Sequence, residues 1–248
     1  MSLYNKRYTK GFTLVEMSIV VLIAGLLIIG LVYGSSVAQN ARIRRTILDV
    51  ENYTQQILLF RNQYSAYPGD MPNASTIWGT QCAPTIANCN GNGDGYIDFN
   101  TTNLLNNESW RAWQHLKLAS IGNNTLSGTG TAATSVIGGN VPASNLNVAL
   151  GWELNTYSTS TQKYTLLELY KIGSTRQGIP CQDVALIDAK IDDGLPRRGN
   201  ITIANTSPST GCYSTSATPY TYNPSNTTTN GSLQRVIIAG LYHPNYEP

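Results

Sequence analysis

The apolar residues of this chain are concentrated near its N-terminus. Positions 12–32 are apolar with five exceptions, which are Thr13, Glu16, Ser18, Gly25 and Gly30. A helix over this run rises about 1.5 Å per residue, so it is long enough to cross the hydrocarbon core of a bilayer. The pattern therefore predicts a helix that spans a membrane.

Basic residues set the expected orientation of this helix. Lys6, Arg7 and Lys10 precede it, so the N-terminus is predicted to stay cytoplasmic and the remainder to be exported. A cleaved secretory signal is the competing interpretation. The run is long for the apolar region of such a signal and no small-x-small site closes it, so we expect the helix to persist.

Beyond the span, the apolar residues take up the period of an amphipathic helix. They fall on one stripe at helical spacing, formed by Ile43, Ile47, Val50, Ile57 and Tyr64. The stripe ends at Tyr67-Pro68-Gly69-Asp70, a strong stop signal. We expect an apolar half over 12–33 and an amphipathic half over 34–66, with the second half packed on a globular head formed by residues 67–248.

The head shows separate helix and strand signals, which favour an α+β fold. Asn106 or Asn107 is expected to cap a helix running to Ala119, with Trp110, Trp113 and Leu116 buried. Residues 183–191 fit either element, and helix is favoured. Segments 122–147 and 205–232 are rich in Gly, Ser, Thr and Asn and are expected to be loops. Strands are predicted at 148–154, 164–172, 201–204 and 235–242.

The composition narrows the class of protein. Only 12% of the 248 residues are charged and the net charge is +2, which excludes a nucleic-acid protein relying on overall basicity. The length suits one domain with an appendage. A low-charge surface rich in hydroxyls and amides suits an extracellular protein.

The start of the apolar run carries a specific string, Lys10-Gly11-Phe12-Thr13-Leu14-Val15-Glu16. Over residues 6–33 the sequence resembles the type IV pilin family and its class III signal. The resemblance implies that a prepilin peptidase cuts between Gly11 and Phe12, removes the leader 1–11 and N-methylates Phe12. It also implies that Glu16 neutralises the terminal amine of a neighbouring subunit, because a buried amine and carboxylate are tolerated only as a pair.

The resemblance further implies an antiparallel sheet laid on the long helix. It predicts a structural subunit of a type IV pilus-like filament, homo- or hetero-oligomeric with other pilins. The subunit would be held in the inner membrane first and displayed on the cell surface later. A type II secretion pseudopilin in a periplasmic pseudopilus is the alternative within this class. Many pilins have a proline where this chain has Tyr33, and Tyr33-Gly34 puts local melting of the helix in doubt.

A third hypothesis needs neither cleavage nor Glu16. It is a single-pass anchored protein whose exported head binds calcium or a carbohydrate. An enzyme is not expected, because His115 and His243 lie in no catalytic motif and the common catalytic signatures are absent from the sequence.

All four cysteines lie in the exported part: Cys82, Cys89, Cys181 and Cys212. An even number outside the cytoplasm indicates disulfides. Proximity along the chain favours Cys82–Cys89 and Cys181–Cys212. A zinc site is the less favoured interpretation, since paired Cys-x-x-Cys spacing is missing.

One loop resembles the calcium loop of EF-hand and dockerin modules. Short oxygen-bearing side chains alternate there around a glycine at the sixth position. The expected ligands are Asn90, Asn92, Asp94, the Tyr96 carbonyl and Asp98. Position 12 is Thr101 rather than an acid, so calcium would bind weakly unless Glu108 or Asp70 folds over the loop. The alternative is a turn whose side chains cap its own backbone.

Two charged stretches are given structural interpretations first. Asp188, Asp192 and Asp193 are expected at a helix end and turn, with Arg197 and Arg198 as possible partners, and a cation or acid–base site as the alternative. The cluster Arg42, Arg44 and Arg45 is interpreted as a solvated face. Lipid headgroup contacts and ion pairs between subunits are its alternatives.

Overall fold

The computed structural model describes the chain in ranges 11–100, 105, 107–122, 125–130, 134–158, 163–174, 177–203, 211–214, 219–223 and 233–239. The chain divides into two compact units, residues 1–42 and 43–248, and each is described by itself. The expected loop 205–232 and the end of the strand expected at 235–242 fall largely outside the described residues.

Helix α1 (Leu14–Tyr64) runs through 51 residues without a break and passes from the first unit into the second. This confirms the predicted long helix, which ends shortly before the expected stop at Tyr67. Its amphipathic stripe faces the head, where Ile43, Val50 and Ile57 are fully buried. Phe60 is also fully buried and extends the stripe, although the sequence pattern did not single it out.

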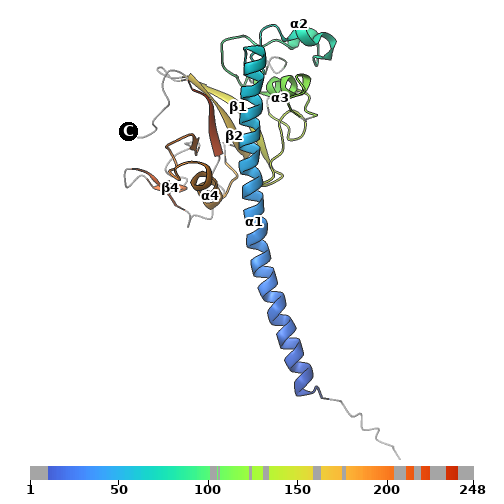
Figure 1. Ribbon diagram of the computed structural model, residues 1–248, viewed down its shortest axis with the longest axis vertical. Coiled ribbons are helices and arrows are strands. Elements are labelled where there is room, and N and C mark those ends of the chain that lie inside the picture. The colour runs from blue at the N-terminus through green and yellow to red at the C-terminus, as the bar shows by residue number, and fades with distance from the viewer. Residues whose placement is uncertain are drawn as a thin grey trace, which may run out of the picture. The chain divides into compact units, whose positions relative to one another are not determined.

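The head contains a four-stranded antiparallel sheet in the order β1-β2-β6-β3. Its strands are β1 (Leu150–Ser158), β2 (Lys163–Lys171), β3 (Ile201–Thr202) and β6 (Leu233–Ala239). The α+β class and the antiparallel sheet are thus as predicted. Figure 1 shows β1 and β2 beside the head part of α1.

Alternation along the two long strands explains this packing. Trp152 pairs with Leu169 and Leu154 with Leu167 across the β1–β2 ladder, and all four side chains are buried. Tyr53 of α1 packs edge-on against Trp152, with ring centroids 5.8 Å apart. The sheet therefore presents an apolar face to the helix, as period-two strands do.

Helix α3 (Glu108–Leu118) covers the outer edge of β1. Trp110, Trp113 and Leu116 are buried as predicted. The capping prediction is wrong in detail: Asn107 occupies the N-cap position but forms no capping bond. Its amide instead donates to the Asn100 carbonyl at 3.1 Å.

The remaining elements are short. Helix α4 (Cys181–Ile191) agrees with the favoured helical interpretation of 183–191. Two elements lie in stretches without a clear sequence signal: α2 (Ala74–Trp78) and the 3-10 turns η1 (Gly79–Gln81) and η2 (Ile86–Asn88). Strands β4 (Tyr213–Ser214) and β5 (Thr221–Tyr222) form a separate two-stranded ladder inside the expected loop 205–232.

Candidate functional site

The first turn of α1 is closed by a reciprocal pair of side chains. The Thr13 amide donates to Glu16 Oε2 at 2.7 Å and the Thr13 hydroxyl donates to the same oxygen at 2.8 Å. The Glu16 amide donates back to Thr13 Oγ1 at 3.2 Å. This is a capping box, which satisfies free N–H groups at a helix start. In the single chain, Glu16 is therefore fixed one helical turn from Phe12.

The expected processing site lies just before this turn. Gly11 is exposed and no heavy atom lies within 4 Å of the position that a Cβ would occupy. Phe12 is 83% exposed. A peptidase would meet no steric obstacle at the bond between them, and cleavage there remains a prediction.

The apolar part of α1 has no cover within the chain. Every large apolar side chain from Phe12 to Leu31 is at least half exposed. Among the described residues, α1 is also the helix that is long and apolar enough to cross a bilayer. Such a surface needs lipid or other apolar helices around it.

The comparisons with known families bear on this same segment. Residues 6–32 match the model of the prokaryotic N-terminal methylation motif. These residues are the class III prepilin signal of type IV pilins and pseudopilins. The resemblance found in the sequence is confirmed. No curated protein and no solved structure shows significant similarity to the chain.

The prepilin signal has direct consequences for the chain. It implies processing by a prepilin peptidase and assembly with other pilin subunits. Together with the apolar helix, it fits a membrane-anchored precursor of a structural protein. The match covers only the start of the chain, so the head has to be understood from its own geometry.

The glycine-rich loop, residues 90–98, is bound to the head through its backbone. Asp70 accepts the Asp94 and Gly95 amides at 3.0 and 2.9 Å. Glu108 accepts the Asn92 and Asp98 amides at 2.8 and 3.0 Å. Both acids that were expected to fold over this loop thus contact it, and they do so as acceptors of backbone N–H groups.

Two glycines allow this close approach. A Cβ on Gly91 would lie 2.3 Å from the Gly69 carbonyl oxygen, and one on Gly69 would lie 2.2 Å from the Glu108 carbonyl oxygen. Gly69 also has a φ of +86°, which disfavours other residues. The strings around Gly69 and Gly91 therefore form one structural unit, although they are far apart in the sequence.

Burial perturbs the titrating groups around this loop. Desolvation raises the pKa of Glu108 to about 7, against the lowering effect of the bonds from the Asp98 and Asn92 amides. Desolvation also raises the pKa of Asp70. Burial lowers the pKa of His115 to about 3. His115 is held neutral, accepting from the Gly69 amide and donating to the Cys89 carbonyl, each at 2.9 Å.

The side chains of the expected calcium ligands already have protein partners. Asn90 Oδ1 accepts the Ser75 amide, and Asn92 Oδ1 accepts the Asp94 amide, each at 2.8 Å. Asp94 Oδ1 accepts the Tyr96 amide at 3.0 Å. These bonds describe the self-capped turn that was the alternative to a metal site.

A lysine stands where the loop concentrates its negative charge. Lys163 Nζ lies 2.5 Å from Asp94 Oδ2 and 3.9 Å from Asp98 Oδ2. The ammonium also lies 4.2 Å above the centre of the Tyr96 ring. In this arrangement the loop does not fit a calcium ion unless Lys163 is displaced, so calcium binding remains a prediction.

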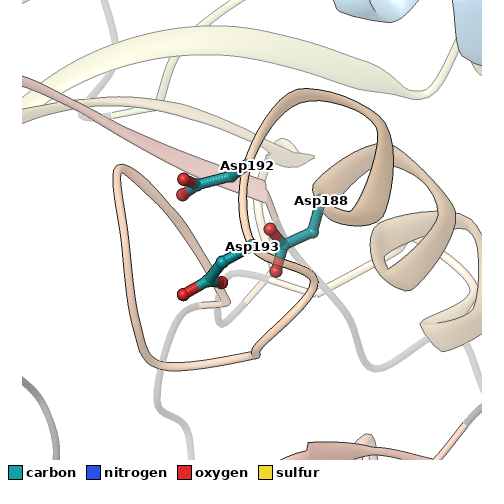
Figure 2. Close-up of side chains that lie close together, drawn as sticks. All are labelled: Asp188, Asp192 and Asp193. Atoms are coloured by element: carbon teal, nitrogen blue, oxygen red, sulfur yellow. The ribbon is translucent and has the colours of Figure 1, made fainter.

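The three acids of the second stretch do gather at the end of α4. Figure 2 shows Asp188 on the helix and Asp192 and Asp193 on the loop after it. One carboxylate oxygen from each lies within 4.8 Å of the others. Desolvation raises the pKa of Asp188 to about 7.

These acids are also used by the fold. Asp188 accepts the Tyr222 hydroxyl at 2.8 Å, and Asp192 accepts the Asn200 and Ile201 amides. Arg198 Nε lies 3.7 Å from Asp193, as expected, whereas the Arg197 guanidinium lies over the Tyr220 ring. The structural interpretation as a helix end and turn accounts for all three carboxylates.

The cysteines pair as their proximity favours. Cys82 is joined to Cys89 and Cys181 to Cys212, and no cysteine is free. The second bond ties α4 to the start of β4. Sequence reasoning missed two buried acids on the other face of the sheet. Glu153 accepts from Ser135 and Tyr170, and Glu168 accepts from Tyr157 and Gln234.

Proposed function

We propose that the chain is a structural subunit of a type IV pilus-like filament, assembled from the inner membrane and displayed outside the cell. The observation that carries this proposal is the prepilin signal at residues 6–32, placed at the start of the continuous helix α1. Signals of this kind serve structural subunits rather than enzymes.

The exposed apolar half of α1 supports this proposal physically. Its side chains are covered by lipid in the precursor and by the same segments of other subunits in a filament. Moving from lipid into a helix bundle costs little, because both environments are apolar. The single carboxylate Glu16 then pairs with the new terminal amine of a neighbour, since neither charge is stable there alone.

A type II secretion pseudopilin is the second candidate in the same class. Both candidates need cleavage after Gly11 and the Glu16 carboxylate, so the signal does not separate them. The large head and its Ser-, Thr- and Asn-rich sequence favour an exposed pilus surface. An anchored calcium- or carbohydrate-binding protein is the third candidate, and it predicts that Glu16 is dispensable.

The test replaces Glu16 in the full chain. Glu16→Gln retains groups that bond to Thr13 but removes the charge, whereas Glu16→Ala removes both. We expect both variants to insert in the membrane and to yield no sheared filaments. Ser18→Ala is the matched control in the same run and is expected to assemble. Wild-type yields of filament from Glu16→Gln would contradict the pairing of charges.

A further inference from the structure

The head part of α1 has an outward face that no part of the described chain covers. Six exposed residues repeat on it at alternating spacings of four and three. They are Arg44, Leu48, Glu51, Gln55, Leu58 and Asn62, and we call them the outer seam. The opposite face, with Ile43, Val50 and Ile57, is buried against the sheet.

The spacing of the outer seam matches that of a helix that packs on another helix. Alternating steps of four and three keep side chains on one stripe and are the spacing of coiled-coil contacts. Leu48 and Leu58 are 61% and 40% exposed. This is unusual cover for water alone, because the same helix buries its other apolar side chains almost completely.

The charges of the outer seam decide how a second copy would lie on it. Arg44 and Glu51 stand one heptad apart, and neither makes an ion pair or hydrogen bond within the part of the chain that the structure describes. Two parallel copies in register would place Arg44 against Arg44 and Glu51 against Glu51. A shift of one heptad, about 10 Å along the axis, places Arg44 of one copy against Glu51 of the next.

We infer that the outer seam binds a second copy of this chain in parallel, staggered by one heptad, with Arg44 of one copy paired to Glu51 of the next. The pairing uses different surfaces of the two copies, so it does not close on itself and continues along a row of subunits. This inference rests on the proposed filament function and names the contact that sets the axial step between neighbouring heads.

Charge reversal tests the pair in the full chain. Arg44→Glu and Glu51→Arg each turn an attraction into a repulsion at every contact, so each is expected to lower sheared filament yield about tenfold. The double variant restores the pair in reverse and is expected to recover most of the yield. Arg45→Glu is the control, because Arg45 is exposed but lies about 100° away around the helix.

Cross-linking tests the stagger while leaving both charges in place. With Leu48→Cys and Gln55→Cys in one chain, oxidised filaments are expected to give a ladder of covalent multimers on non-reducing gels. Leu48→Cys alone is expected to give monomers. The native cysteines do not interfere, since all four are already paired.

The outcomes separate this inference from the proposed function. Wild-type cells without sheared filaments would contradict the filament function itself. Wild-type filaments together with unchanged yields from both single reversals, or with dimers from Leu48→Cys alone, would overturn only the staggered contact. Loss of yield in Arg44→Glu without rescue by Glu51→Arg would assign the arginine to an anionic lipid surface instead and would also overturn the pair.

Discussion

Asp70 shows how single residues hold the head together. Its side chain is 2% exposed and accepts two amides of the glycine-rich loop. Its own carbonyl accepts the Gly93 amide at 3.0 Å. Asp70 therefore fixes the connection from α1 to the head against a loop more than twenty residues away.

Removing this side chain should destabilise the head. We expect Asp70→Ala to lower the free energy of unfolding by about 2 kcal/mol, because two amides lose a charged acceptor. Asp98→Ala is the control and should cost less than about 1 kcal/mol, since its ion pair with Lys163 is long and partly exposed. Urea unfolding of the full chain in mild detergent measures both. Equal losses would contradict the role given to Asp70.

Calcium binding makes a separate prediction at the same loop. An ion there has to displace Lys163 from Asp94. If it does so, the melting temperature rises in millimolar calcium relative to a chelator, and Asp94→Ala reduces the rise. Lys163→Gln removes the competing cation and should enlarge the rise. No shift in any of the three proteins would remove the site.

The sequence predicted the residues of this loop but not their partners. The alternation of Asn, Asp and Gly indicated oxygen-rich turns, and these turns are present. That Lys163 lies at the loop depends on where β2 begins, which local sequence does not determine. The buried pair Glu153 and Glu168 was missed for a similar reason, because an acid inside an apolar run normally indicates a solvent-facing position.

At the scale of elements, the two disulfides constrain loops of very different length. The sequence separation is 7 residues for Cys82–Cys89 and 31 for Cys181–Cys212. A longer closed loop restricts the unfolded chain more. The second bond therefore has the larger expected contribution to stability.

Paired serine substitutions test this order. Replacing Cys181 and Cys212 by Ser is expected to cost about 4 kcal/mol, and replacing Cys82 and Cys89 about 2 kcal/mol. Urea unfolding of the full chain under oxidising conditions provides the comparison. A larger loss from the short loop would contradict this account and would point to the His115 bond at Cys89 as the stronger effect.

The long elements could be predicted from sequence and the short ones could not. Helix α1, α3 and α4 carry stop signals or periodic apolar residues. Strands β4 and β5 have two residues each, too few for any alternation. The outer half of β1, residues 155–158, has a polar sequence and is a strand because β2 pairs with it and Thr156 donates to the Ile97 carbonyl.

At the scale of the whole molecule, buried acids predict how stability depends on pH. The pKa values of Glu108 and Asp188 are each raised to about 7, by desolvation foremost. Each group binds its proton more tightly when folded. The stability that it contributes is fully present below its ordinary pKa and is lost as the pH rises through about 7.

The head should therefore be more stable at pH 6.5 than at pH 8. The lowered pKa of His115, about 3, acts in the opposite direction only below its ordinary pKa of 6.5, so it leaves this window unaffected. The urea midpoint of the full chain at the two pH values measures the effect, and Glu108→Gln should flatten it. A midpoint that rises between pH 6.5 and 8 would contradict the assignment.

The central claim concerns the fate of the N-terminus, and mass spectrometry of the N-terminal peptide tests it most directly. We would measure this peptide in the sheared surface fraction and in the membranes of expressing cells. The account predicts an abundant sheared species that begins at methylated Phe12. A processed species confined to membranes would favour a pseudopilin. A chain that still begins before Gly11 in both fractions would contradict the filament function and leave an anchored exported domain.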